Sequence, residues 1–296
     1  MDRPFRFGVL VSRFDPAVDL RDLGQRAEAL GYSTVLVNDH LVDQPAPLLA
    51  LLAIANATDS LRVGTLVLNA ALRTPLVLAR ELALLDLLSD GRLEVGLGAG
   101  WDEREHCSAG VPFASAGERV ALVGELLTAL ELLWGGGEVS FPGTQVRLDR
   151  AQCLPLPLQR PGPPIALPLS GPRMIQLAAR HAGIVDIPGR GTSAAETRSR
   201  LRYFQMKAGT RVQDVEIAKV LAGVGPDVNR LEPAAGRSWA IEHGASSDLP
   251  SILVGGQQTM IDTLLNRREE LGISYVIVPA AAMDAFAPLI GELGKE

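Results

Sequence analysis

Short apolar runs alternate along the chain with longer segments in which apolar residues recur every three or four positions. The short runs predict buried strands, and the longer segments predict helices that bury one face. The expected strands span residues 5–11, 34–38, 61–68, 92–98, 164–169, 184–187, 215–222 and 274–279. Each is followed by an expected helix, over residues 20–30, 48–57, 75–88, 117–134, 171–182, 193–208, 258–271 and 283–293.

Strands that each precede a helix, in this number, indicate an α/β fold of the (β/α)8 or TIM-barrel type. The near-continuous apolar character of the strands is typical of parallel strands buried on both faces. Insertions are expected after strands 4 and 7, and residues 138–163 are Pro-rich and are expected to be irregular. An open, doubly wound sheet is the alternative, and it would normally contain fewer strands at this length. We expect one domain over residues 1–296.

Composition and charge exclude several classes of protein. The chain is 47% hydrophobic and 21% charged, which excludes a disordered protein. A net charge of −6, with no basic run longer than Arg267-Arg268, gives no electrostatic footprint for nucleic acid or an anionic membrane. No apolar stretch is long enough for a membrane span, and the first residues lack the apolar region of a signal peptide, so we expect a cytoplasmic protein.

The cysteine and histidine spacings predict no metal site. Cys107 and Cys153 form no C-x-x-C pair and are expected to be unpaired thiols in a reducing compartment. His106, His181 and His243 show no metal-ligand spacing, and we expect them to be solvated or satisfied surface groups.

The ends of the strands carry the candidate chemistry, because a barrel builds its active site at the carboxyl ends of its strands. The residues expected there are Ser12, Arg13, Asn38, Asp39, His40, Asn69, Gly98, Ala99, Gly100, Trp101, Ser170, Gly171, Gly189, Arg190, Gly191, Gly223, Pro279 and Ala280. Asp39 and His40 place a carboxylate and an imidazole at one strand end, which suits proton transfer near neutral pH. The alternative is structural: Asp39 caps the following loop and His40 packs beside it.

Two glycine-bearing segments are candidate ligand contacts. The glycines from Gly96 to Gly100 permit close approach of a flat or phosphorylated ligand, or else they turn a tight corner of the barrel. A dinucleotide-binding fingerprint is disfavoured there, because no helix opens within the motif. Ser170-Gly171, at the start of a helix, is a candidate phosphate site to which Arg173 adds a charge, or else an ordinary helix cap. Ser193 and Glu196 are expected to form a structural capping box.

Four segments resemble a known enzyme family. They are Asn38-Asp39-His40, residues 70–75 (AALRTP), residues 85–101 (LDLLSDGRLEVGLGAGW) and residues 159–165 (QRPGPPI). These segments resemble the bacterial luciferase-like monooxygenase superfamily, and more narrowly its coenzyme F420-dependent oxidoreductase branch. The block LDLLSDGR followed by alternating glycines and Trp101 is the most specific, and Leu271-Gly272-Ile273 adds support.

The resemblance implies a (β/α)8 barrel that binds coenzyme F420 or, alternatively, FMN at its mouth. It implies that Asp39 and His40 lie beside the ring as catalytic residues, with Asp39 also contacting the cofactor. The remaining cofactor contacts that it implies are Leu68, Asn69 and Ala70 at the back of the ring, Ala99, Gly100 and Trp101 along the groove, and Ser170, Gly171 and Arg173 at the phosphate. Family members often have a non-prolyl cis peptide bond in the segment that corresponds to Leu68-Asn69-Ala70.

The chain also departs from the family pattern. The F420-dependent sugar-phosphate dehydrogenases carry a catalytic Glu just after the fourth strand, where Trp101 stands here. The segment after the sixth strand commonly ends in Asp-Gly-Trp, whereas residues 182–186 read AGIVD. The resemblance therefore does not carry over those enzymes' substrate or the contacts of that loop.

The leading hypothesis is an F420-dependent oxidoreductase that moves a hydride between the cofactor and a small organic substrate, with His40 transferring the proton. One alternative is an FMN-dependent monooxygenase that uses oxygen and receives reduced flavin from a partner enzyme. Another is a non-catalytic carrier of F420 or flavin. The apolar helices and extended insertions favour a homodimer.

Overall fold

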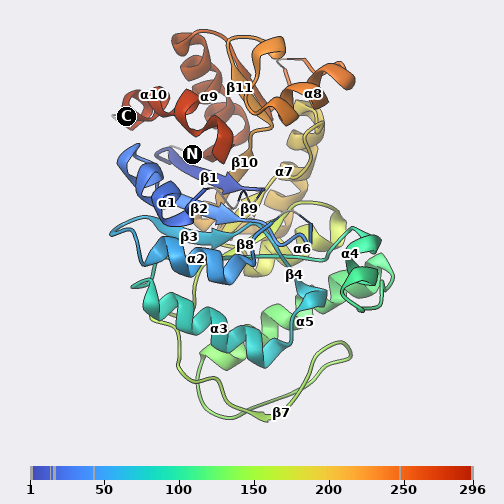
Figure 1. The fold of residues 1–296 in the computed structure, drawn as a ribbon. Coiled ribbons are helices and arrows are strands. Elements are labelled where there is room, and N and C mark those ends of the chain that lie inside the picture. Colours follow the sequence, from blue (N-terminus) through green and yellow to red (C-terminus); the bar gives the residue numbers. More distant parts are fainter. Residues whose placement is uncertain (1–2, 14, 16–17, 43, 247, 295–296) are drawn as a thin grey trace.

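Parallel strands close into a barrel in the computed structural model, which describes residues 3–13, 15, 18–42, 44–246 and 248–294 (Figure 1). The hydrogen-bonded order is β3-β2-β1-β13-β10-β9-β8-β5, and a further pairing of β3 with β5 closes the ring. The barrel strands are β1 (Arg6–Val11), β2 (Thr34–Val37), β3 (Arg62–Thr65), β5 (Leu93–Gly98), β8 (Ile165–Pro168), β9 (Ile184–Asp186), β10 (Glu216–Val220) and β13 (Ile273–Pro279). The predicted (β/α)8 barrel is confirmed.

Helices follow the barrel strands and cover the outside of the ring (Figure 1). They are α1 (Leu20–Ala29), α2 (Pro47–Ala55), α3 (Pro75–Leu88), α5 (Ala116–Trp134), α6 (Pro172–His181), α7 (Ala194–Ala208), α9 (Gln257–Leu271) and α10 (Met283–Leu293). The Ser193–Glu196 capping box that opens α7 is confirmed, since each side chain bonds the other's backbone amide. Among the described residues, no helix combines the length and hydropathy that crossing a membrane requires.

Side-chain alternation along the strands divides the core into two parts. A small cluster lies inside the barrel: Leu10, Leu36, Ala166, Ile184, Ala218, Tyr275 and Ile277. The intervening strand residues, such as Val9, Val35 and Val185, join the larger cluster between strands and helices. Because successive side chains point to opposite faces, each strand supplies both layers.

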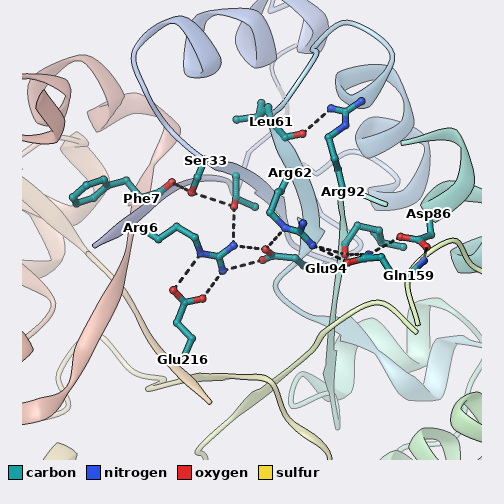
Figure 2. Close-up of polar contacts among 12 residues, drawn as sticks. Arg6, Phe7, Ser33, Leu61, Arg62, Asp86, Arg92, Glu94, Gln159 and Glu216 are labelled. Atoms are coloured by element: carbon teal, nitrogen blue, oxygen red, sulfur yellow. Dashed lines mark hydrogen bonds and ion pairs between the residues drawn. The ribbon is translucent and has the colours of Figure 1, made fainter. Parts of the chain in front are cut away.

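Ion pairs close the amino-terminal end of the barrel. Arg6, Arg62, Glu94 and Glu216 stand at or next to the first residues of their strands, and their side chains converge (Figure 2). Arg6 Nη2 lies 2.7 Å from Glu216 Oε2, and Arg62 Nε lies 2.7 Å from Glu94 Oε1. Arg6 also pairs with Glu94. Each buried charge therefore has a partner of opposite sign, as a buried charge requires.

The third strand differs from the prediction. Instead of one strand over residues 61–68, the chain forms β3 and the short β4 (Leu68–Asn69), with the non-prolyl cis bond between Leu66 and Val67. The cis bond was expected within Leu68-Asn69-Ala70, so its predicted position is wrong by two residues. The composition could not show this break, because the apolar run continues through it. After β4, the single turn η1 (Ala70–Leu72) leads to α3.

Glycines on β5 fit this broken segment. A Cβ on Gly96 would lie 2.1 Å from the carbonyl oxygen of Thr65, and one on Gly98 would lie 2.5 Å from a methyl group of Val67. A side chain on Gly96 would displace the backbone of β3, and one on Gly98 would displace the Val67 side chain. Close packing inside the barrel explains both glycines.

One segment expected to be irregular contains secondary structure. The hairpin of β6 (Val139–Pro142) and β7 (Arg147–Ala151) replaces part of the predicted irregular stretch (Figure 1). Its turn is held by Glu125 of α5, whose carboxylate accepts from the backbone amides of Thr144, Gln145 and Val146. A residue distant in sequence thus stabilises the turn, which explains why local periodicity missed it.

The insertions expected after the fourth and seventh barrel strands are present. After β5 the chain forms α4 (Glu103–Ser108). The predicted seventh strand, residues 215–222, ends at Val220, and the chain continues as β11 (Gly223–Gly225), η3 (Val228–Arg230), α8 (Ala234–Glu242) and β12 (Ile252–Val254). β11 pairs with β12 in a separate small sheet beside α9 (Figure 1). The remaining single turns are η2 (Gly209–Asp214) and η4 (Ala280–Ala282).

Candidate functional site

A cavity of about 1190 Å³ opens at the carboxyl ends of β1, β2, β9, β10 and β13. Its floor is the uppermost layer of inward-facing side chains, including Leu10, Leu66 and Val220 among the apolar residues and Asn38 and Asp186 among the polar ones. A volume of this size at the strand ends of a barrel is typical of a site for an organic ligand.

His40 lines the cavity and is held by a carboxylate. Its Nδ1 lies 2.8 Å from Oε1 of Glu105, which is 8% exposed and belongs to α4. Since the carboxylate accepts the Nδ1 hydrogen, Nε2 is the nitrogen left for a ligand. The rings of His40 and Trp101 also meet in a T-shaped contact, with centroids 5.9 Å apart, while most of Trp101 is exposed.

Asp39 is buried and its two carboxylate oxygens are engaged by the protein. Oδ1 accepts from Arg73 Nη2 at 2.6 Å, and Oδ2 accepts from the backbone amide of Asn69 at 3.0 Å. Asp39 thus ties the end of β2 to the start of η1. Its geometry suits a positioning role better than proton exchange with a ligand, because both oxygens are already occupied.

Asn69, Gly100 and His106 form a packed group behind His40. Asn69 Nδ2 lies 3.2 Å from His106 Nε2, and His106 Nδ1 lies 3.3 Å from the carbonyl oxygen of Pro112. Gly100 has φ +67°, and a Cβ there would lie 2.6 Å from the Asn69 amide and 2.7 Å from His106. His106 is therefore fully buried and bonded, and the expectation of a surface histidine is wrong because α4 turns it inward.

The other predicted cofactor contacts fall into two groups. Leu68 and Ala70 are almost fully buried in the core that lies between strands and helices, and Ala99 packs against that core. Ser170 and Arg173 are exposed, and a Cβ on Gly171 would meet nothing within 4 Å. The open space at Gly171 precedes α6, whose first turn has no side-chain cap bond. Backbone donors there are free to bind an anion.

Asp186 and Lys219 also line the cavity, and the sequence reading had not selected either of them. Burial raises the pKa of the Asp186 carboxyl to about 6, against the opposing effect of the Lys219 charge. Burial lowers the pKa of Lys219 to about 8. Shifted pairs of this kind mark candidate functional groups.

Comparison of the sequence with models of known protein families identifies its family. The luciferase-like monooxygenase model matches residues 5–227. The chain belongs to the luciferase-like monooxygenase family. The resemblance of the strand-end motifs, and the assignment to the luciferase-like oxidoreductases that rests on it, are thereby confirmed.

Two similar proteins are redox enzymes of different types. The chain is 31% identical over 228 residues to the F420-dependent glucose-6-phosphate dehydrogenase of Nakamurella multipartita, covering 72% of this chain and 66% of that protein. It is 28% identical over 209 residues to the oxygenase component of the flavin-dependent trigonelline monooxygenase of Acinetobacter baylyi, covering 69% of this chain and 57% of that one. The matches thus span less than two thirds of either relative.

A solved structure has the same fold. The coenzyme F420-dependent tetrahydromethanopterin reductase from Methanopyrus kandleri superposes with a TM-score of 0.81 at 19% identity, over 98% of both chains. At that identity the likeness establishes the barrel fold alone.

Within this luciferase-like barrel, the structure brings together only part of the predicted site. Ser12, Asn38 and His40 line the cavity with Gly189, Arg190 and Pro279. Asp39, Asn69 and Gly100 lie behind His40, while Ser170, Gly171 and Arg173 lie at the end of β8. Glu105 was not among the predicted site residues. Its signal was present, since an acidic and an imidazole residue adjoin at positions 105–106 soon after a strand end.

Proposed function

We propose that the chain is an oxidoreductase that transfers a hydride between coenzyme F420 and a small organic substrate bound at the barrel mouth. One observation carries the proposal: the His40 imidazole lies at the wall of the large cavity with its Nδ1 held by buried Glu105. The proposal is supported by family membership and by the F420-dependent relative.

The residues present fit a ring-bearing, phosphorylated cofactor. The cavity has apolar walls, and the buried Oδ1 of Asn38 has no hydrogen-bond partner. The open space at Gly171 leaves room for a phosphate that Ser170 and Arg173 would help to bind. When bound, the deazaflavin supplies the acceptor or donor of the hydride.

His40 would move the proton that accompanies the hydride. Oxidation of a hydroxyl-bearing carbon breaks its C–H bond, which yields the hydride, and its O–H bond, which yields a proton. Nε2 of His40 accepts that proton, and Glu105 stabilises the resulting charge through Nδ1. In the reducing direction, the protonated His40 imidazole returns the proton to the carbonyl oxygen of the substrate. Asp39 acts on this step indirectly, because it fixes the backbone of Asn69.

Binding and turnover assays test the proposal with the intact protein. Fluorescence titration with oxidised F420 should give saturable binding, and the absorbance of F420 should change on turnover with alcohol or carbonyl substrates. Absence of binding to both F420 and FMN would overturn the proposal.

A second candidate function is an FMN-dependent monooxygenase. The flavin-dependent relative from Acinetobacter baylyi favours it. Oxygen consumption with reduced FMN, compared with absorbance change in reduced F420, separates the two functions.

A further inference from the structure

Asp186 is the last residue of β9 and stands on the inner face of the barrel. Ile184, two positions earlier, belongs to the interior cluster, whereas Val185 packs toward the helices. Since side chains alternate along a strand, Asp186 points inward with Ile184. Its register partners are Pro168 on β8 and Ala218 on β10. The adjacent side chains at this level are therefore apolar.

The Asp186 carboxyl is only partly satisfied: the backbone amide of Ile187 stabilises its charged form, but no donor reaches Oδ1. The residue is 8% exposed, and Oδ1 is buried without a hydrogen bond. Its backbone carbonyl accepts from the amide of Leu169 at 2.8 Å, so the residue is fixed within the sheet. A buried acceptor in a rigid position, without a donor, is satisfied when a ligand supplies one.

Lys219 lies near Asp186 but does not satisfy it. Lys219 Nζ donates to the carbonyl oxygens of Ile187 at 2.8 Å and Gly189 at 3.0 Å, which anchors it to the segment after β9. No ion pair joins the two side chains within the described part of the chain. The positive charge nevertheless favours the ionised carboxyl, opposing the effect of burial. Asp186 therefore places negative charge in the cavity lining at neutral to mildly alkaline pH.

The surroundings define the kind of ligand that fits. Leu10, Leu66 and Val220 supply the apolar part of the floor around Asp186. A matching ligand has a hydrocarbon body and a hydroxyl or ammonium group. A carboxylate at the same place would be repelled by Asp186 and would leave its Oδ1 without a donor.

We propose that Asp186 binds substrate on the cavity floor by accepting a hydrogen bond from a hydroxyl or ammonium group, and that it selects against carboxylates there. The assignment of that ligand as substrate rests on the proposed oxidoreductase function. The binding of a hydrogen-bond donor to Asp186 is independent of that function.

Fluorine NMR with three probes of one shape tests the proposal. The probes are para-fluorobenzylamine, para-fluorobenzyl alcohol and para-fluorobenzoate, each titrated into the full chain without cofactor at about pH 7.5. The amine and the alcohol should bind about tenfold more tightly than the benzoate, as expected for a charge-assisted hydrogen bond. Equal binding of the three probes overturns the proposal.

Two substitutions locate the binding. Asp186→Asn should weaken binding of the amine by about tenfold to a hundredfold and remove the discrimination against benzoate. Asp284→Asn is the matched control, because Asp284 also lines the cavity but is exposed and pairs with Arg26 at 2.7 Å. It should change the affinities by less than about twofold. An unchanged probe preference in Asp186→Asn overturns the proposal, and Asp186→Ser repeats the test if the first variant does not fold.

F420 titration of the same variants separates this proposal from the proposed function. Asp186→Asn should retain F420 affinity. An equal loss of F420 affinity would make Asp186 a cofactor contact and overturn its assignment to substrate. If the wild type binds neither F420 nor FMN yet still prefers the amine, the oxidoreductase proposal fails while the donor-binding site stands.

Discussion

Glu105 Oε1 lies 2.8 Å from His40 Nδ1, although the two residues are 65 positions apart in the chain. The barrel supplies the imidazole from the end of β2, and the insertion after β5 supplies the carboxylate from α4. The pair exists only when the insertion is folded against the mouth. Insertion and barrel are thus coupled through one hydrogen bond at the cavity.

Glu105→Gln should lower kcat by about tenfold to a hundredfold and leave F420 affinity unchanged. The amide still accepts the Nδ1 hydrogen but lacks the charge that stabilises a protonated ring. Steady-state kinetics and fluorescence titration measure the two effects. Glu103→Gln, an exposed position on the same helix, is the control and should match the wild type. Equal kcat values in the two variants would remove Glu105 from the mechanism.

His40→Ala should reduce kcat/KM by about a hundredfold or more and retain F420 binding. An enzyme loses turnover without its proton-transfer group, whereas a non-catalytic carrier would have no turnover to lose. Parallel assays of binding and F420 absorbance make the comparison. The exposed His243, which stacks on Trp239, provides the control substitution His243→Ala. Full turnover in His40→Ala would assign the proton transfer elsewhere.

Arg173→Ala should weaken F420 binding by about threefold to thirtyfold, because an exposed cation near the start of α6 would contribute to phosphate binding. Arg180→Ala, at the other end of the same helix, should leave the affinity unchanged. Fluorescence titration at two ionic strengths measures both variants. If the two arginines have equal effects, the phosphate lies away from Gly171.

Gly100→Ala should destabilise the fold by about 2 to 4 kcal/mol. The positive φ disfavours any side chain, and the added Cβ would also collide with Asn69 and His106. Gly110→Ala measures the effect of the positive φ alone: Gly110 has φ +69° but open space around its Cβ, so the change should cost about 1 kcal/mol. Urea unfolding of both variants provides the measurement. If the two variants lose similar free energies of unfolding, Asn69 and His106 move aside for the added Cβ at little cost.

Asp186→Asn should stabilise the fold at neutral pH. The folded state raises the pKa of this carboxyl from 3.8 to about 6, so it binds the proton more tightly than the unfolded chain does. Its contribution to stability is full below about pH 4 and is lost as the pH rises through about 6. Removing the charge should therefore raise the free energy of unfolding at about pH 7.5 by up to roughly 3 kcal/mol. Thermal unfolding of the variant and the wild type from about pH 4 to pH 8 should show that the stabilisation disappears at about pH 4.

The fold was largely predictable, because each barrel strand is an apolar run and each outer helix has an apolar face. Strand boundaries held within a few residues except near Leu66, where an uninterrupted apolar run conceals the break between β3 and β4. The β6–β7 hairpin was missed because Glu125, on a preceding helix, supplies the acceptor that holds its turn.

The site was less predictable, since its contacts join residues from different strands. The strand-end position together with the family resemblance selected His40, but not Glu105, which reaches it from an insertion. Asp186 was hidden because it ends a short apolar run and reads as part of a strand. Its inward direction follows from the barrel register, which the sequence alone does not specify.

The charged cluster of Arg6, Arg62, Glu94 and Glu216 closes the amino-terminal end of the barrel, so the cavity opens only at the carboxyl ends of the strands (Figure 2). A molecule that reaches the floor near Asp186 has no exit through the opposite end. It must leave by the opening through which it entered, past whatever else occupies the mouth. The deeper of two ligands is therefore expected to enter first and depart last.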